Sequence, residues 1–337
     1  MITFFTSPIG LGHATRDIAI AEKLNADILF ISGEGAANLL TRKGFNSLDV
    51  YRPEKFTVKS GQLKHSFRWL MDYYSFYKKC KEIARGIMDK HNGLIVSDED
   101  FASIAVGEEM NRKRVLITDL TETHFTAGAA AIVEKLMNRR MQKMMDHCDF
   151  VIIPDVGEDS GNVAHVGPIV RQVSADRETL RERFGFARNT VIVSVGGTDA
   201  GRFLIEKAIE AHSRLKGRTD SELVIVSGPL LALPDSPAYR NLGFVENLHE
   251  LIYAADLVIS LAGRSTMDES IAYGTPGIFI PIKSHFEQEH GAARLGFKHE
   301  DIFRLETLIE EKLGRRNNTV ESRGAESTAK IISSLSN

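Results

Sequence analysis

Residues 190–212 read TVIVSVGGTDAGRFLIEKAIEAH, and residues 2–24 read ITFFTSPIGLGHATRDIAIAEKL. Each stretch opens with a short run of β-forming residues, passes through a glycine-containing loop, and ends with apolar residues at helical spacing. Because the same strand–loop–helix order opens both halves of the chain, the sequence predicts two Rossmann-like α/β units in tandem.

Other apolar runs alternate with helical stretches, and continuous runs of this kind are typical of parallel sheets covered on both faces. We expect these strands at 28–31, 94–96, 115–118 and 150–153 in the first half, and at 223–226, 257–260 and 278–281 in the second. A Gly-Pro pair at 167–168 marks the boundary between the halves. We therefore expect an N-terminal domain at 1–166, a C-terminal domain at 170–315, and a helical tail at 316–337 that crosses back onto the first domain.

Composition and charge narrow the class of protein. Of the 337 residues, 43% are hydrophobic and 26% are charged, which are ordinary values for a chain that folds around a core. The formal net charge of −3 provides no general attraction for nucleic acid. No run is apolar enough for a membrane span, the first residues lack the basic start of a secretory signal, and the two cysteines make no disulfide framework. We expect a cytoplasmic enzyme whose membrane contact is peripheral, on the inner face of the cell membrane.

Both glycine loops stand where ligands are expected. In open parallel sheets, ligands bind beyond the carboxyl ends of the strands, where helix N-termini favour anions. Gly10 and Gly12 belong to the first loop, and Gly196, Gly197 and Thr198 belong to the second. We expect the two domains to face each other across a cleft that holds the active site. A simple tight turn would also account for the second loop.

The most informative stretch runs from residue 247 to residue 295. It reads NLHELIYAADLVIS at 247–260 and LAGRST at 261–266, and it continues with GTP at 274–276. Together with GFV at 243–245 and GLGH at 10–13, this pattern resembles the GT-B glycosyltransferases. The likeness is strongest to the MurG-like N-acetylglucosaminyltransferases of peptidoglycan synthesis and their family 28 type of C-terminal domain. It follows the chain in order over nearly its whole length, and it implies GT-B architecture with a nucleotide-sugar site in the second domain and acceptor binding in the first.

The resemblance implies a diphosphate site at the start of the helix after strand 257–260. Backbone N–H groups, hydroxyls and a guanidinium there can bind phosphate oxygens. The residues concerned are Gly263, Arg264, Ser265 and Thr266. Glu269 falls one turn into the same helix, where the family's glutamate accepts both ribose hydroxyls. An exposed arginine and a solvated glutamate are the plainer interpretations of Arg264 and Glu269.

Two further pairs complete the implied donor site. Phe244 and Val245 resemble the loop whose backbone recognises the uracil edge. Glu287 and Gln288 match the acidic-Gln pair that hydrogen-bonds the donor sugar. The loop that contains Gly196 resembles the segment that approaches the phosphates or the acceptor.

Catalysis requires a base for the acceptor hydroxyl, and the first domain offers candidates. His13 follows the first glycine loop at a helix N-terminus, and imidazole titrates near neutral pH. Asp98 is the second candidate because it stands at the end of a predicted strand, although an acid there also caps the next helix in many proteins. Asp119 and His124 are weaker candidates for the base. The sequence shows no metal-ligand spacing, so we expect no metal and no cofactor, with the UDP-sugar as a substrate.

For the region that meets the acceptor, the sequence offers only its amino-acid composition as a guide. Residues 62–91 carry seven basic and three acidic side chains, a balance of +4, interleaved with aromatic residues. This pattern is typical of an interfacial helix that meets a lipid-linked acceptor at an anionic membrane. A helix that packs its aromatic residues into the core is the alternative. Residues 136–145 add methionines and basic side chains to the same hypothesis.

The sequence therefore favours an inverting, metal-independent glycosyltransferase that moves a sugar, N-acetylglucosamine as the first choice, from a UDP-sugar to a lipid-linked or glycan acceptor. A nucleotide-sugar hydrolase of the pseudaminic-acid-pathway type is the alternative, since residues 10–16 and 196–199 also resemble that enzyme. There His13 would activate or position water. A non-catalytic scaffold is disfavoured because it has no need of a complete donor site.

Overall fold

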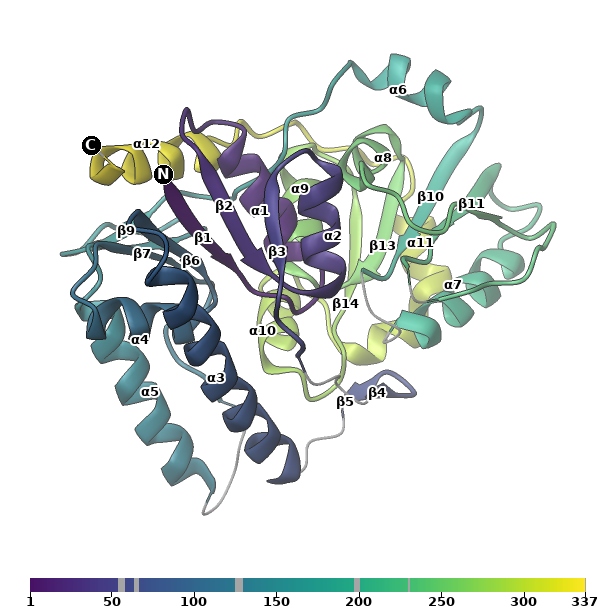
Figure 1. The fold of residues 1–337 in the computed structure, drawn as a ribbon. Helices are drawn as coiled ribbons and strands as arrows, with labels where there is room; N and C mark the ends of the chain where they lie inside the picture. Colours follow the sequence, from purple (N-terminus) through teal and green to yellow (C-terminus); the bar gives the residue numbers. More distant parts are fainter. Residues whose placement is uncertain (54–57, 64–66, 125–129, 197–200, 230, 337) are drawn as a thin grey trace. The chain divides into compact units, whose positions relative to one another are not determined.

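The computed structural model describes residues 1–337 except 54–57, 64–66, 125–129, 197–200, 230 and 337. The chain forms two compact units (Figure 1). Unit 1 comprises Met1–Lys55, His65–Val170 and Ser322–Asn337, and unit 2 comprises Phe56–Lys64 and Arg171–Glu321.

Unit 1 is built on a seven-stranded parallel sheet. In spatial order its strands are β3 (Asn46–Asp49), β2 (Ile28–Ser32), β1 (Ile2–Thr6), β6 (Leu94–Asp98), β7 (Arg114–Ile117), β8 (Phe150–Ile153) and β9 (Val163–His165). The central strands β1 (ITFFT) and β6 (LIVSD) are buried along their whole length, which explains why most of their residues are apolar. The expected parallel sheet of the first half is confirmed.

The described helices of unit 1, except the last, lie between its strands in the sequence. They are α1 (Gly12–Ala21), α2 (Glu34–Arg42), α3 (Phe67–Met88), α4 (Phe101–Glu109), α5 (Ala130–Asp146) and α12 (Gly324–Ser336). The last of them, drawn in yellow in Figure 1, contacts α1, so the C-terminal segment does cross back onto the first sheet as expected. Ala325, Ala329 and Ile332 are the buried apolar residues of α12.

Unit 2 carries a five-stranded parallel sheet. In spatial order its strands are β12 (Arg240–Asn241), β11 (Ser221–Val226), β10 (Asn189–Ser194), β13 (Leu257–Leu261) and β14 (Gly277–Ile280). Its helical segments are α6 (Arg177–Phe184), α7 (Arg202–Arg214), α8 (Leu248–Ala254), α9 (Arg264–Ala272), α10 (Phe286–Arg294), a 3-10 helix (His299–Arg304) and α11 (Leu305–Lys312). A hairpin, β4 (Val58–Lys59) with β5 (Gln62–Leu63), belongs to the same unit.

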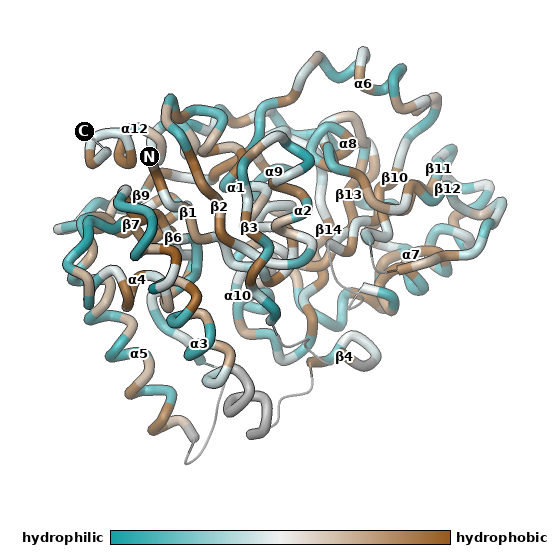
Figure 2. Tube along the Cα trace, in the orientation of Figure 1, coloured by the Kyte–Doolittle hydropathy of each residue, from teal (hydrophilic) through white to brown (hydrophobic). Residues whose placement is uncertain are grey.

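The cores follow the hydropathy of the strands. In Figure 2, β1 and β2 of unit 1 and β10 and β13 of unit 2 are mainly brown. One cluster of buried side chains packs α7 and α11 against the five-stranded sheet, with Val193, Leu204 and Ile309 at or below 1% exposure. Burial of this kind contributes roughly 25 cal/mol for each Å² of apolar surface removed from water.

Each sheet has a point where the strand order reverses. In unit 1 the chain builds from β1 outward through β2 and β3, then returns to place β6 on the other side of β1. In unit 2 it builds from β10 through β11 and β12, then returns to place β13 beside β10. Loops that leave two neighbouring strands in opposite directions open a crevice at the carboxyl edge, and ligands of open α/β sheets bind there.

Candidate functional site

The reversal point of unit 1 brings helix α1 over the ends of β1 and β6. Gly10, with φ +76°, turns the chain after β1 so that α1 starts at Gly12. His13, Arg16 and Asp17 are three and four residues apart on α1 and therefore share one face. Thr6 at the end of β1 and Asp98 at the end of β6 are register partners. The α1 face lies against these strand ends, because Asp17 accepts from Thr6 and Arg16 donates to Asp98.

Asp98 is the centre of this cluster. It is fully buried, and both of its carboxylate oxygens accept hydrogen bonds from Arg16, with Nε at 2.6 Å from Oδ2 and Nη2 on Oδ1. His13 Nδ1 lies 3.0 Å from the same Oδ1. The next helix, α4, is capped by Asp100, whose side chain accepts from Ala102 N, so Asp98 is not the helix cap. The two residues expected to be catalytic, His13 and Asp98, are thus in direct contact.

A second carboxylate anchors Arg16 from the neighbouring strand. Asp119, just after β7, accepts a hydrogen bond of 2.7 Å from Arg16 Nη1. Asp119 is held in turn by Glu99, whose Oε1 accepts from Asp119 N at 2.7 Å and from Thr118 Oγ1 at 2.8 Å. Glu99 has φ +57°, in the left-handed region that costs a non-glycine residue about 1–2 kcal/mol. His124, by contrast, is exposed and contacts Glu122.

The charges of the cluster set the protonation of its members. Burial alone would raise the pKa of Asp98, but Arg16 and then His13 hold it well below its usual range. Burial alone would lower the pKa of His13, but Asp98 raises it above its ordinary value of 6.5. Burial, followed by repulsion from Asp119, raises the pKa of Glu99 to about 7. His13 therefore takes a proton readily beside a carboxylate that stays ionised.

Asp17 completes the cluster. It is fully buried and accepts a hydrogen bond of 2.7 Å from Thr6 Oγ1. Burial, and next the charge of Asp98, raise the pKa of Asp17 well above its usual range. The raised pKa favours the uncharged form of this carboxyl over that of an exposed aspartate.

The reversal point of unit 2 brings the loop after β10, which contains Gly196, and the loop after β13, which contains Gly263, to one edge of the sheet. Ser194 of β10 and Ser260 of β13 are register partners, so the segments that follow them start side by side. Gly196 is exposed with φ +75°, and an added Cβ would meet nothing within 4 Å. Gly197 and Thr198 lie outside the residues that the structure describes.

The loop after β13 ends at the N-terminus of α9. Gly263 is the residue before the helix, and no side chain caps the helix there. Arg264 Nε donates to Asp268 Oδ2 at 2.8 Å, so its charge is already balanced within the helix. Ser265 and Thr266 are half-buried in the first turn. A helix start of this kind favours an anion through its N–H groups and its dipole.

Glu269 is buried rather than solvated. It is 3% exposed, and its Oε1 accepts a hydrogen bond of 3.0 Å from Arg171 Nε. Arg171 also donates to Glu246 O at 3.0 Å, and Tyr273 donates to Arg171 O at 2.6 Å. Burial raises the pKa of Glu269, and the Arg171 charge opposes that rise. The carboxylate is thus held in place one turn after the N-terminus of α9.

Phe244 and Val245 lie between β12 and α8, at the same carboxyl edge as α9. Both are half-buried. The turn before them is shaped by Gly243, with φ +62°, whose carbonyl accepts from Gly228 N at 3.1 Å. Since β12 is only two residues long, the backbone leaves the sheet directly into this segment. Backbone groups placed in this way can recognise the edge of a planar base.

Glu287 and Gln288 occupy the first turn of α10, after β14. Gln288 Oε1 accepts a hydrogen bond of 3.0 Å from Ile282 N, which fixes the amide so that its NH₂ group is left to donate. Glu287 is half-buried beside it. Because β13 and β14 pair through Leu261 and Ile280, this turn and the start of α9 follow adjacent strand ends.

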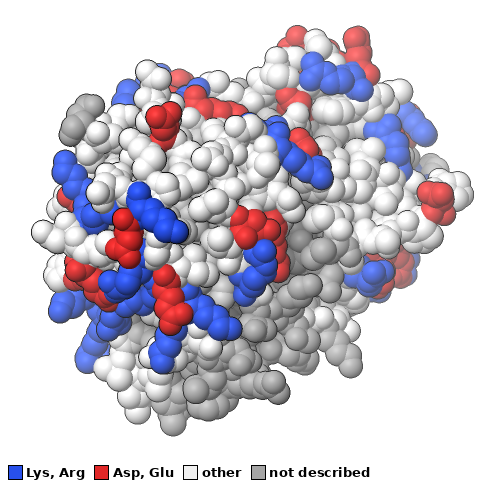
Figure 3. All heavy atoms as spheres, viewed as in Figure 1, with Lys and Arg blue, Asp and Glu red and all other residues white. Residues whose placement is uncertain are grey.

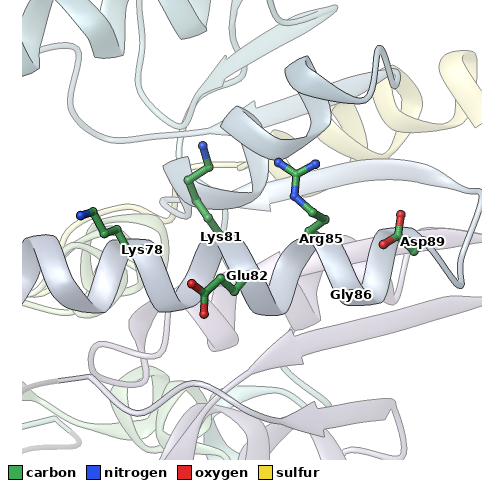
Figure 4. Close-up of a pocket in the computed structure, with 6 residues that line it drawn as sticks. All are labelled: Lys78, Lys81, Glu82, Arg85, Gly86 and Asp89. Carbon is green, nitrogen blue, oxygen red and sulfur yellow. The ribbon is translucent and has the colours of Figure 1, made fainter.

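The described residues also form a cavity away from the carboxyl edges of both sheets. A surface cavity of about 510 Å³ on α3 is lined by Lys78, Lys81, Glu82, Arg85, Gly86 and Asp89 (Figure 4). Two of its cations share one carboxylate, because Lys81 and Arg85 both donate to Glu109. Among the described residues there is no group of three or more His, Cys, Asp or Glu side chains that could hold a metal ion.

Three residues of these clusters have no role predicted from the sequence: Arg16, Glu99 and Arg171. Arg16 was quoted only as part of a motif, yet its spacing from His13 on one helix face was a usable signal. Glu99 stood beside Asp98 without an assigned role. Arg171 carries no local signal at all, because its partner Glu269 is 98 residues away in the chain.

Known proteins resemble this chain in sequence and in fold. Residues 190–327 match the glycosyltransferase family 28 C-terminal domain. The chain is 26% identical over 280 residues to an uncharacterized glycosyltransferase of Methanopyrus kandleri, covering 74% of this chain and 78% of the relative. It is 32% identical over 184 residues to the UDP-N-acetylglucosamine–N-acetylmuramyl-(pentapeptide) pyrophosphoryl-undecaprenol N-acetylglucosamine transferase of Rubrobacter xylanophilus, covering 49% and 53% of the two chains. The fold is similar to that of the glycotransferase of kitacinnamycin, with a TM-score of 0.65, 14% identity, and coverage of 99% and 93%.

The cluster around Asp98 predicts stability losses of very different size for two isosteric substitutions. Asp98→Asn leaves Arg16 buried without half of its counter-charge, so the free energy of unfolding should fall by about 3–5 kcal/mol. The raised pKa of Asp17 favours its uncharged form, which an amide resembles, so Asp17→Asn should change the free energy of unfolding by less than about 1 kcal/mol. Urea unfolding of both variants at pH 7 measures this difference. Equal losses for the two variants would contradict the assigned charges.

Proposed function

We propose that the chain, a glycosyltransferase of GT-B fold, transfers N-acetylglucosamine from a UDP-sugar to a hydroxyl of a lipid-linked or glycan acceptor. The premise is the match of residues 190–327 to the glycosyltransferase family 28 C-terminal domain. In this proposal unit 2 binds the donor and unit 1 supplies the base. The observation that carries the second part is the contact between His13 and Asp98 at the strand reversal of unit 1.

Unit 2 has the chemistry that a nucleoside diphosphate sugar needs. The N-terminus of α9 suits the diphosphate, and the rigid Glu269 carboxylate below it suits the ribose hydroxyls. The backbone at Phe244 and Val245 is the candidate for the base. The name of the Rubrobacter xylanophilus relative gives UDP-N-acetylglucosamine as its donor, which supports the choice of nucleotide and sugar.

The sugar itself is assigned to the start of α10. The NH₂ group of Gln288 can donate to a sugar hydroxyl or an N-acetyl carbonyl, and the Glu287 carboxylate can accept from hydroxyls. A side chain whose orientation is fixed by the backbone loses little entropy on binding, so each such hydrogen bond discriminates well between sugars.

The proposed reaction is a single displacement. His13 accepts the proton of the acceptor hydroxyl, the hydroxyl oxygen bonds to the anomeric carbon, and the bond from that carbon to the UDP oxygen breaks. The electron pair leaves with UDP, whose charge the start of α9 stabilises, and the configuration at the anomeric carbon inverts. Asp98 holds the imidazole in place and stabilises the imidazolium that forms.

We also propose that unit 1 meets an anionic membrane through α5. Three apolar side chains of its first two turns are exposed, Ile132 at 67%, Val133 at 48% and Leu136 at 58%. The following turns expose Arg139, Arg140 and Lys143. An apolar end followed by basic side chains is the pattern that binds at the interface of an anionic bilayer.

Helix α3 contributes less to this surface than its composition suggests. Figure 3 shows its basic side chains interspersed with acidic ones in the region over α3 and α4. Cys80, Ala84 and Met88 pack into the core, which supports the core-packing alternative for this end of the helix. The side chains of residues 67–73, including Trp69 and Tyr73, lie outside the described part of the structure. No described helix is both long and apolar enough to span a bilayer.

The first experiment separates transfer from hydrolysis. The purified protein is incubated with UDP-N-acetylglucosamine, with and without a membrane lipid extract, and both UDP and free sugar are measured. We expect UDP release only with lipid, with the sugar recovered in the lipid fraction. Free sugar released without lipid, and abolished by His13→Ala, would establish the hydrolase instead.

The base assignment predicts a pH profile. Only neutral His13 accepts a proton, so kcat/KM should rise with pH through the raised pKa of His13. His13→Ala should lower kcat by about 10²–10⁴-fold. Asp98→Asn removes the main cause of the raised pKa, so the remaining activity should begin at lower pH. If kcat/KM of Asp98→Asn depends on pH in the same way as that of the wild type, the assignment of His13 as the base is wrong.

The membrane surface is tested by sedimentation with vesicles of phosphatidylglycerol and phosphatidylcholine. Leu136→Asp should weaken binding about tenfold or more, because insertion of one leucine is worth about 1.5–3 kcal/mol. Val156→Asp is the matched control, since Val156 is 83% exposed and lies outside α5. Equal binding of the two variants would exclude α5 as the contact.

A further inference from the structure

The hairpin β4–β5 stands in the sequence between β3 and α3 of unit 1, yet it is part of unit 2. Val58 pairs with Leu63, and Lys59 pairs with Gln62. The two residues between them, Ser60 and Gly61, have φ values of +50° and +73°, the pattern of a type I′ turn. Isolated two-stranded hairpins of this size are marginally stable in water, so its place depends on what it contacts.

The hairpin binds one residue of the loop after β14 through the backbone. Lys283 N donates to Gly61 O at 2.9 Å, and Leu63 N donates to Lys283 O at 2.9 Å. Both backbone groups of Lys283 are therefore satisfied by the hairpin, as in one step of a parallel sheet. Leu63 is 6% exposed, which adds a buried apolar anchor to these two hydrogen bonds.

Gly61 lies so close to two side chains of unit 2 that a larger residue would crowd them. A Cβ at this position would stand 2.9 Å from His299 Cε1 and 3.0 Å from Phe203 Cδ1. His299 Nδ1 is 3.0 Å from Pro281 O. The hairpin thus lies close to His299, whose side chain contacts the loop after β14.

This loop is the one that orients Gln288. Ile282, the residue between Pro281 and Lys283, donates the backbone hydrogen bond that fixes the Gln288 amide. The hairpin holds the residue after Ile282 directly, and it holds the residue before it through His299. The position of the Ile282 N–H group therefore depends on both contacts.

We propose that the hairpin 58–63 is a positioning element of the donor-sugar site, and that it sets the selectivity for the sugar of the nucleotide donor by fixing the loop that orients Gln288. This inference rests on the proposed role of Gln288 in binding the sugar. The residues assigned to the nucleotide, at the start of α9 and at Phe244 and Val245, make no contact with the hairpin among the interactions described above. The hairpin therefore affects the binding of the sugar and does not change the affinity for the nucleotide.

The test compares UDP with UDP-N-acetylglucosamine as ligands of the full-length chain by titration calorimetry. Gly61→Ala adds a Cβ that collides with His299 and Phe203. Gly161→Ala is the matched control, because Gly161 also has positive φ, +60°, and a Cβ there meets nothing within 4 Å. Leu63→Ala loosens the hairpin without backbone strain. Gln288→Ala removes the side chain that the hairpin is proposed to position, and thermal unfolding verifies that all variants fold.

We expect wild type to bind UDP-N-acetylglucosamine more tightly than UDP. Gly61→Ala and Leu63→Ala should reduce that preference about five- to tenfold, as Gln288→Ala does, with the affinity for UDP unchanged and with Gly161→Ala like wild type. If Gln288→Ala reduces the preference and neither hairpin variant does, the inference about the hairpin is wrong and the proposed function stands. If wild type binds no UDP, or Gln288→Ala changes nothing, the proposed donor site fails and the role of the hairpin fails with it.

Discussion

The buried carboxylate of Asp98 is the constraint on which unit 1 depends. It ends β6 at the strand reversal, and it can stay ionised there only because Arg16 binds both of its oxygens and His13 adds a third contact. Breaking a buried ion pair on one side is costly, so the three residues specify one another's positions. Asp119 fixes the far side of the Arg16 guanidinium, and Glu99 fixes Asp119. The arrangement holds an imidazole at the carboxyl edge of a parallel sheet with its Nδ1 side occupied.

Unit 2 repeats the construction with other residues. Glu269 is buried near the second strand reversal, and Arg171 compensates its charge while also binding the backbone at Glu246. In both units a rigid polar cluster underlies a glycine-containing loop, where a helix N-terminus favours an anion. A glycosyltransferase needs a stabilised leaving diphosphate and a base for the acceptor, and the two clusters suit these separate tasks. The hairpin on the loop after β14 extends the same principle to the sugar.

The sequence predicted the central strands well because buried parallel strands are continuous apolar runs, as at 150–153, where the predicted strand and β8 coincide. It missed β3 and β12, which are short polar edge strands without such a run. For the site, local motifs indicated His13, Asp98 and Glu269 but not their partners. The pairing of Arg171 with Glu269 and the return of 58–63 to unit 2 depend on tertiary packing, which leaves no periodic signal.

The most direct test of this account is the titration of the His13 imidazole by NMR, with its signals assigned among the 11 histidines through His13→Gln. We expect a pKa above 6.5 in the wild-type protein and a lower pKa in Asp98→Asn, because Asp98 is the main group that raises it. A wild-type pKa at or below 6.5 that Asp98→Asn does not change would contradict the central claim that Asp98 holds the imidazole of His13 and raises its pKa.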